Sequence, residues 1–173
     1  DGISWLEPEL GLFEHNGSKK NNYVWMGVGP SHTGTHGFAP FKDTNSNAAP
    51  DEQYKALGTL YGQGAEPGLY SMYSPDGFHW QLSQESPVMT CGKFDSQNLA
   101  FWDTETRRYC SYVRNFHKGK QDNEVADNRD MGIRDIRVCY SDDFIKWSEP
   151  EMLTYTGSAD EALYTNQVTP YYR

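Results

Sequence analysis

Short runs of apolar and aromatic residues alternate with polar turns along the chain, and this pattern favours many short strands over helices. Residues 98–102 form an apolar run that predicts an inner strand. Strand-forming Tyr, Val and Ile side chains follow at residues 109–114 and 133–140, and an outer strand is expected at residues 151–155. Four successive antiparallel strands of this kind are typical of one blade of a β-propeller.

An earlier stretch of the chain has the same pattern. Its strands are predicted at residues 22–26, 54–61 and 68–73, so that residues 22–26 take the place of the inner strand. A last, incomplete repeat begins near residues 164–168. The repeats differ in length because they carry polar loops of different size, of which residues 117–130 form the longest in the later repeat.

A turn of the form Asp-x-x-x-Trp supports the same division. It occurs at residues 1–5, 76–80 and 143–147, and the second and third copies are each preceded by Tyr-Ser. Beyond the Trp and one intervening residue, the first and third copies both continue as Glu-Pro-Glu. The Asp carboxylate can accept backbone N–H groups in a tight turn, and the Trp can fold back against the preceding strand.

The predicted fold class is therefore all-β, a single β-propeller domain with four-stranded antiparallel blades. The approximate blade boundaries are 1–18, 19–92, 93–158 and 159–173. The chain covers about two to three blades, whereas propellers carry about 4–8. We therefore expect the remainder of the ring to come from the same polypeptide or from another chain.

Composition narrows the range of partners. Hydrophobic residues make up 36% and aromatic residues 14% of the chain, as expected of a folded globular protein. The formal net charge of −9 argues against binding to nucleic acid or to an anionic membrane surface, and no apolar run is long enough to span a membrane. The three cysteines fit no zinc signature, so they are either buried thiols or one disulfide with a free thiol. No metal or cofactor is expected.

Candidate chemistry lies at the predicted inner strands. Asp95 stands at the mouth of one inner strand, Glu161 at the mouth of the next, and Asp43 in a long loop of the earlier repeat. Three carboxyl groups that converge on one channel would suit the hydrolysis of a glycosidic bond, which needs a protonated acid and a carboxylate. Acidic side chains that merely cap turns are the alternative.

Polar and aromatic side chains near these acids are candidates for binding sugars. Asparagine recurs at the start of each predicted inner strand, where its amide can bind sugar hydroxyl groups or hydrogen-bond one blade to the next. The candidate amides are Asn22, Asn98, Asn166 and Gln167. Arg114 could bind a carboxylate or sulfate on a sugar, or form a surface ion pair.

A loop that contains His32 and His36 could reach over the site. Two histidines without a third ligand are a weak metal signal, so we expect His36 to contact substrate or solvent rather than a metal. Trp25 could stack on a sugar ring, although most of the aromatic side chains should belong to the core.

These residues together resemble the five-bladed propeller glycosidases of families 32 and 43. The resemblance rests on the Tyr-Ser-x-Asp-x-x-x-Trp turn with its Glu-Pro, on the strand opening at residues 95–103, and on the Tyr-x-x-Tyr-x-Arg at residues 109–114. It implies that Asp43 is base or nucleophile, Asp95 the second Asp and Glu161 the general acid. The family 32 motif Trp-x-Asn-Asp-Pro-Asn-Gly is absent, and Arg-Asp-Ile at residues 134–136 falls on a third strand.

The resemblance implies a secreted or periplasmic bacterial glycoside hydrolase that acts on a plant or algal glycan. The competing interpretation is a non-catalytic propeller that binds glycan or serves as a scaffold. The turns also resemble the Asp-box of sialidases, but Gly follows the Asp directly and the Thr is missing. A polysaccharide lyase is a further alternative.

Overall fold

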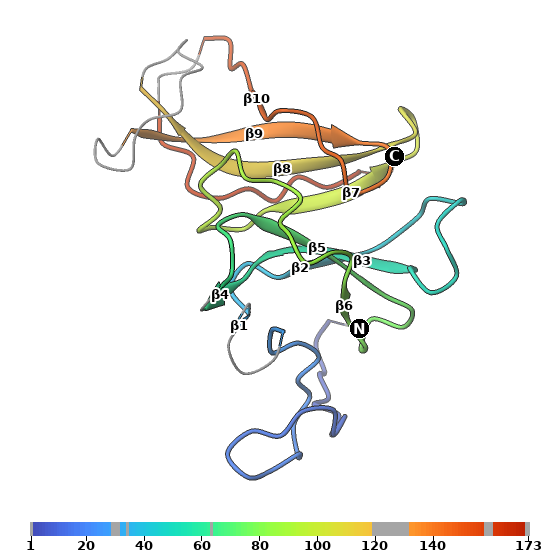
Figure 1. Cartoon of the computed structure of the whole chain (residues 1–173). Helices are drawn as coiled ribbons and strands as arrows, with labels where there is room; N and C mark the ends of the chain where they lie inside the picture. The colour runs from blue at the N-terminus through green and yellow to red at the C-terminus, as the bar shows by residue number, and fades with distance from the viewer. Residues whose placement is uncertain are drawn as a thin grey trace.

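The computed structural model describes the chain at residues 2–28, 32–33, 35–62, 64–118, 132–157 and 161–171. These residues form strands, turns and extended segments, with no helix among them and hence none that could cross a membrane. Figure 1 shows two sheets, one above the other, with the N-terminal residues in blue running away from both. The predicted all-β class is confirmed for the described residues.

The first sheet, called sheet I below, is antiparallel and has the strand order β2-β3-β5-β6. A short pair of strands, β1 (His32–Thr33) and β4 (Tyr61–Gly62), lies beside it as a separate two-stranded sheet. The four strands of sheet I are β2 (Ala39–Lys42), β3 (Tyr54–Thr59), β5 (Leu69–Ser74) and β6 (Gln81–Leu82).

The inner strand predicted for this stretch was wrong. Residues 22–26 form no strand, and β2 occupies that edge of the sheet, where Pro40 pairs with Ala56. Proline has no N–H to donate, which an edge strand tolerates. Residues 22–26 are attached to the sheet by side-chain packing instead, because the Trp25 ring stacks on Phe38 with ring centres 5.6 Å apart.

The second sheet, called sheet II, repeats this order with the next four strands. Each strand is antiparallel to its neighbour, and the predicted strands of the later stretch are confirmed to within a few residues. Most of the predicted loop at residues 117–130 lies outside the described residues. The strands are β7 (Leu99–Asp103), β8 (Arg108–His117), β9 (Ile133–Ser141) and β10 (Glu151–Met152).

The core fills the space between the two sheets. Its buried members come from both sheets and from the segment that joins them: Leu57, Leu69, Met89, Phe94, Ala100, Tyr109, Val113, Cys139 and Phe144. Because side chains alternate along a strand, Tyr109 and Val113 of β8 point toward sheet I, whereas Arg114 and Phe116 lie on the opposite face. Sheet II therefore has a second face that is available to later parts of the chain.

The two described Asp-x-x-x-Trp turns have the same hydrogen bonds. In one, Asp76 accepts the backbone N–H groups of Phe78 and His79, and in the other Asp143 accepts those of Ile145 and Lys146. Each tryptophan N–H donates to a carbonyl three residues earlier, at 2.9 Å and 3.2 Å. The predicted role of the Asp is confirmed for both copies, and the return of the Trp to the preceding strand is confirmed for the later copy, where Trp147 forms a β-bridge with Ser141 of β9.

One position in this turn explains the glycine that follows the Asp. Gly77 has a φ of +80°, and Phe144 at the equivalent position has a φ of +65° although it is not glycine. The Phe144 ring is buried and packs edge-on against Tyr109, with ring centres 5.1 Å apart. In the first copy Asp1 lies outside the described residues, and Trp5 is 83% exposed.

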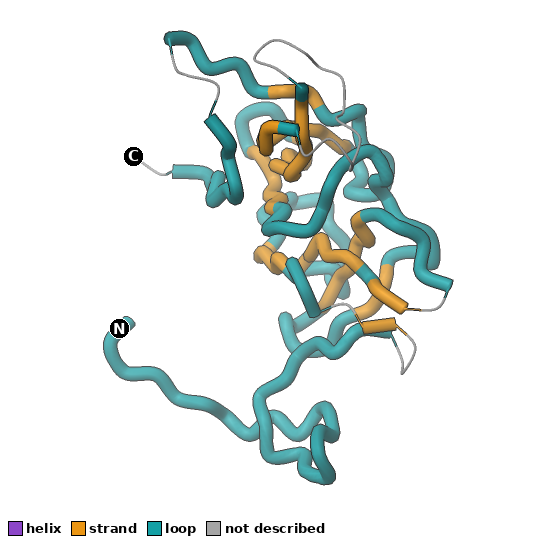
Figure 2. Tube along the Cα trace, turned by 90° about the vertical axis from the view of Figure 1, so that its left-hand side faces the viewer, coloured by secondary structure: helices purple, strands orange, loops and turns teal. Residues whose placement is uncertain are grey.

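The C-terminal segment, residues 161–171, runs beside the strands toward the C-terminus (Figure 2). Its Tyr164 ring contacts Arg114 and Arg134, which lie on the second face of sheet II. The Leu163 N–H donates to the carbonyl of Arg134 at 2.9 Å, and the Ser96 hydroxyl donates to the carbonyl of Tyr164 at 3.1 Å. This segment therefore joins the start of β9 to the loop that precedes β7.

Candidate functional site

Asp95 and Arg114 form an ion pair at the end of sheet II where β7 begins. Asp95 Oδ1 lies 3.1 Å from Arg114 Nη1, yet the two side chains are 66% and 2% exposed, respectively. A buried guanidinium that holds an exposed carboxylate fixes the position of an acid that solvent and ligands can still reach. This pair is the starting point of the candidate site.

The loop that carries Asp95 is fixed by the amide of Asn98. Its Nδ2 donates to the carbonyls of Phe94 and Ser96 at 3.1 Å and 2.7 Å, and its Oδ1 accepts the backbone N–H of Arg114 at 3.0 Å. Asn98 is fully buried and both its N–H groups are used. Asp95 lies between two residues that are held inward, so its own side chain projects outward.

His36 approaches this loop from the side of sheet I. Its Nε2 lies 3.2 Å from the Asp95 carbonyl oxygen, and its own carbonyl accepts the Thr59 hydroxyl at 3.1 Å. The structure thus places His36 at the candidate site, with an exposed side chain. The side chain of His32 lies outside the described residues.

Glu161 and Gln167 lie on the C-terminal segment, and both are exposed. Neither makes a hydrogen bond or ion pair within the described part of the chain. The segment is held close to Asp95, because Ser96, the next residue, donates to the carbonyl of Tyr164. Asp95 and Glu161 therefore lie at the same end of sheet II.

Asn166 has a structural position. Its Nδ2 lies 3.2 Å from the carbonyls of both Gln97 and Tyr112, and its Oδ1 accepts the Val168 N–H at 3.4 Å. Like Asn98, it connects segments of the chain rather than facing solvent. Of the two functions considered for these amides, the structure favours the hydrogen bond within the fold.

Asp43 lies elsewhere. Its side chain is fully buried, 3.1 Å from the ammonium of Lys55, and it accepts a hydrogen bond from the Tyr109 hydroxyl at 2.6 Å. Burial and this hydrogen bond raise the pKa of Tyr109 well above its ordinary value. On β8, Tyr109 lies five positions before Arg114, which is roughly 17 Å along a strand. The expected convergence of three acids is therefore not observed, because Asp43 is bonded to Lys55 of sheet I and to Tyr109 of sheet II.

Asn22 and Trp25 belong to the N-terminal segment that precedes sheet I. Asn22 is an exposed residue of the N-terminal segment and does not begin a strand. Trp25 is half-buried against Phe38, which in turn packs edge-on against Trp80 with ring centres 5.0 Å apart. Trp25 thus belongs to an aromatic stack that attaches the N-terminal segment to sheet I.

Asp135, from the Arg-Asp-Ile sequence, is part of a buried polar cluster. Its Oδ2 lies 3.0 Å from His117 Nδ1 and 3.2 Å from Arg137 Nη2, and all three residues are buried. By the alternation along β8 and β9 these side chains point toward sheet I. Asp135 is therefore buried and not exposed to a substrate, although the sequence around it is like the family 32 motif.

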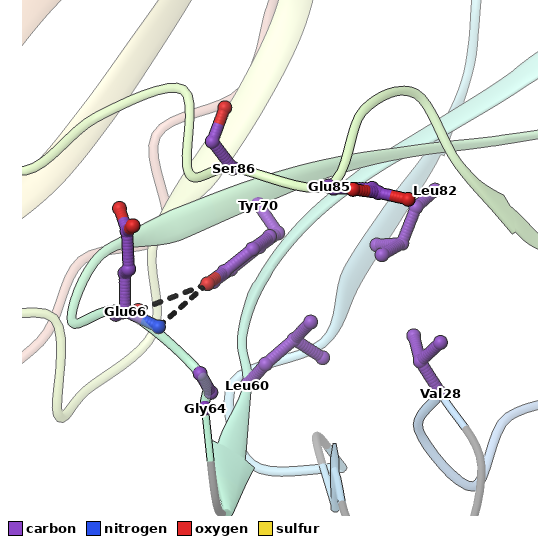
Figure 3. A pocket seen from close by; sticks show the side chains of 9 residues that line it. Val28, Leu60, Gly64, Glu66, Tyr70, Leu82, Glu85 and Ser86 are labelled. Carbon is purple, nitrogen blue, oxygen red and sulfur yellow. Dashed lines mark hydrogen bonds between the residues drawn. The ribbon is translucent and has the colours of Figure 1, made fainter.

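A hollow of about 460 Å³ lies beside sheet I (Figure 3). Its lining includes Val28, Leu60, Tyr70 and Leu82, with the acids Glu66 and Glu85. The Tyr70 hydroxyl bonds the backbone N–H and carbonyl of Glu66 at 3.1 Å and 3.0 Å. No candidate residue from the sequence lines this hollow, so we do not assign the site to it.

Sequence analysis missed two aromatic neighbours of Arg114. The guanidinium lies 4.9 Å from the ring centre of Phe116 and 5.2 Å from that of Tyr164. Phe116 could have been found from the alternation of side chains on one strand. Tyr164 could not, because it arrives from a segment far along the chain.

Comparison with known proteins yields no match: no protein family, no curated protein and no solved structure matches the chain. Among the described residues, no three His, Cys, Asp or Glu side chains form a group that could hold a metal ion. Function is therefore inferred from the geometry of the site and from the sequence resemblance.

Proposed function

We propose that this chain is part of a five-bladed β-propeller glycoside hydrolase, with sheets I and II as neighbouring blades. One observation carries the proposal: the exposed Asp95 carboxylate, held by buried Arg114, lies at the same end of sheet II as exposed Glu161. Hydrolysis of a glycosidic bond needs two such carboxyl groups flanking one site. The protein is proposed to be secreted or periplasmic and to act on a plant or algal glycan.

The two acids are given different roles. Asp95 is the base or nucleophile, because its ion pair with the buried Arg114 guanidinium fixes the direction of the exposed carboxylate. Glu161 is the general acid, in keeping with the order of acids in the resembling families. Asp43, assigned as base or nucleophile by order alone, has no part in this proposal because it is buried against Lys55.

Exposed polar side chains beside the two acids are proposed to bind the sugar. His36 reaches the Asp95 loop from sheet I, and Gln167 follows Glu161 on the same segment. Imidazole and amide groups can each donate and accept hydrogen bonds, as can the hydroxyl groups of a sugar. No metal or cofactor is needed for this reaction class.

A glycan-binding propeller without catalysis is the second candidate. It would use the exposed His36 and Gln167 for hydrogen bonds to the glycan, with no acid or base role for Asp95 and Glu161. The two functions make different demands on the carboxyl groups, because binding tolerates an amide where acid–base chemistry does not.

The test is to change Asp95→Asn and Glu161→Gln separately in the natural protein and to measure reducing sugar released from plant and algal polysaccharides. Loss of an acid or base group should lower the rate by about 10²–10⁴-fold without loss of folding. Asp142→Asn, an exposed acid in a turn, is the matched control and should not change the rate. Activity that survives both site changes would refute the catalytic roles of Asp95 and Glu161, and binding without hydrolysis would favour the second candidate.

A further inference from the structure

Two guanidinium groups share the same two aromatic rings at the candidate site. Arg114 lies 4.9 Å from the ring centre of Phe116 and 5.2 Å from that of Tyr164. Arg134 lies 5.6 Å and 5.3 Å from the same ring centres. We call these four residues the arginine–aromatic cluster.

The backbone builds this cluster from three segments. Arg114 and Phe116 alternate onto one face of β8, and Arg134 of β9 is the direct register partner of Phe116. The Leu163 N–H donates to the Arg134 carbonyl, which places the next residue, Tyr164, over both guanidinium groups. The arrangement therefore follows from ladder pairing and one tether, not from the chance contact of long side chains.

The positive charge of the cluster exceeds its negative charge. Asp95 balances Arg114, but Arg134 forms no ion pair within the described residues. The Nε atoms of both arginines are buried and lack a hydrogen-bond partner there. A buried donor without an acceptor is destabilising, and two nearby cations repel, so an incoming anion would stabilise the cluster.

We propose that the arginine–aromatic cluster binds the anionic group of an acidic sugar, either a carboxylate or a sulfate ester. Both groups present oxygen atoms in the planar or tripodal arrangement that guanidinium forks pair with. Tyr164 is 63% exposed, so an incoming ring can reach its face. This inference depends on the proposed function for the choice of a sugar, and it defines the class of glycan.

The position of the cluster beside Asp95 gives the anion a second effect. Because Arg114 contacts both Asp95 and the shared rings, an anion bound at Arg134 lies next to the proposed catalytic carboxylate without replacing it. The acidic group would thus orient the substrate relative to the scissile bond. Neutral glycans lack that contact and are expected to bind more weakly.

The test is isothermal titration calorimetry of the natural protein with three oligosaccharides of equal length: a galacturonan, a sulfated galactan and a neutral galactan. We expect at least one charged oligosaccharide to bind about tenfold or more tightly than the neutral one, because a charged hydrogen bond contributes about 1.5–3 kcal/mol. Which charged oligosaccharide binds tighter distinguishes carboxylate from sulfate. Equal affinity for all three would overturn the inference, as would inorganic sulfate competing as strongly as the sugar.

Variants of Arg134 locate the effect. Arg134→Gln should remove the preference for the charged oligosaccharide, and Arg134→Lys should keep part of it, because charge remains while the fork is lost. Arg108→Gln is the matched control: this arginine stacks on Tyr140 at 3.6 Å, near the other end of β8. An unchanged preference in Arg134→Gln, or a loss of preference in Arg108→Gln as well, would refute the assignment.

The outcome can be separated from that of the proposed function. If Arg134→Gln abolishes the charge preference in binding while no oligosaccharide is hydrolysed, the anion site stands and the hydrolase proposal fails. If a glycan is hydrolysed while Arg134→Gln leaves the preference for charged over neutral oligosaccharides unchanged, the hydrolase stands and the anion site fails.

Discussion

Replacing Asp43 by Asn tests whether this residue stabilises the contact between the sheets or takes part in chemistry. Its carboxylate is fully buried between the Lys55 ammonium at 3.1 Å and the Tyr109 hydroxyl at 2.6 Å. The amide has nearly the shape of the carboxylate but no charge. Lys55, itself 4% exposed, would then keep Glu52 as its remaining ion-pair partner in the described structure, at 2.9 Å.

The expected loss of stability follows from this geometry. Removing one member of a buried ion pair costs about 3–5 kcal/mol. Because Glu52 still balances Lys55 and is 39% exposed, we expect the lower end, about 3 kcal/mol. With a urea dependence of about 2 kcal/mol per M, the unfolding midpoint should fall by roughly 1.5 M.

Urea unfolding followed by tryptophan fluorescence measures this shift. Asp142→Asn, an exposed acid, is the control and should change the free energy of unfolding by no more than about 0.5 kcal/mol. Replacing Asp43 by Leu together with Lys55 by Met removes both charges and should recover part of the loss. An Asp43→Asn protein with an unchanged midpoint and abolished catalysis would refute the reasoning and return Asp43 to the active site.

Three further predictions concern the turns and the thiols. Hydrogen bonds from His79 lower the pKa of Asp76 below its ordinary value of 3.8, so its contribution to stability is complete above pH 3.8 and is lost as the pH falls below that value. In Asp76→Asn, the free energy of unfolding should therefore depend less steeply on pH in this acid range. Gly77→Ala should lower stability by about 1 kcal/mol in thermal unfolding, because its φ of +80° strains any L side chain. Iodoacetamide should label Cys91, which is exposed, before Cys139, whose burial raises its pKa to about 12; equal native labelling rates by mass spectrometry would contradict this.

Much of sheet II could be predicted because its local signals agree. Aromatic and β-branched residues mark β8 and β9, and the Asp-x-x-x-Trp turn that follows supplies its own hydrogen bonds from within seven residues, Ser141 to Trp147. Such features depend on short stretches of chain, so the sequence pattern is sufficient. The sequence left open whether the cysteines are free thiols or include a disulfide, and the structure has three free thiols, two buried and one exposed.

Sheet I was harder because its edge is chosen by tertiary packing. Residues 22–26 have the composition of a strand, whereas β2 contains Pro40. The choice depends on contacts across the sheet, such as the packing of Phe38 against Gly58, where an added Cβ would lie 3.6 Å from the Phe38 Cα. No local pattern reports that contact.

Long-range contacts also determine which of Asp43 and Asp95 is buried and which is exposed. Asp43 follows a strand in a polar loop, as an exposed acid would, and its burial depends on Tyr109, which lies 66 residues later. Asp95 stands in a similar polar setting, but Asn98 turns the loop so that Asp95 faces solvent. Sequence position made both acids candidates, with Asp95 at the mouth of a strand and Asp43 in a loop, and the long-range partners show that Asp43 is buried while Asp95 is exposed.

The recurrent asparagines connect the fold to the proposed chemistry. Asn98 fixes the loop that carries Asp95, and Asn166 fixes the segment that carries Glu161 by bonding the carbonyls of Gln97 and Tyr112. Each amide is used up by backbone groups, so neither can bind a sugar through those atoms. Their recurrence ahead of successive segments is therefore explained by a structural requirement, namely holding two acids at one end of sheet II. An amide that never touches the ligand can still determine where the carboxyl groups lie.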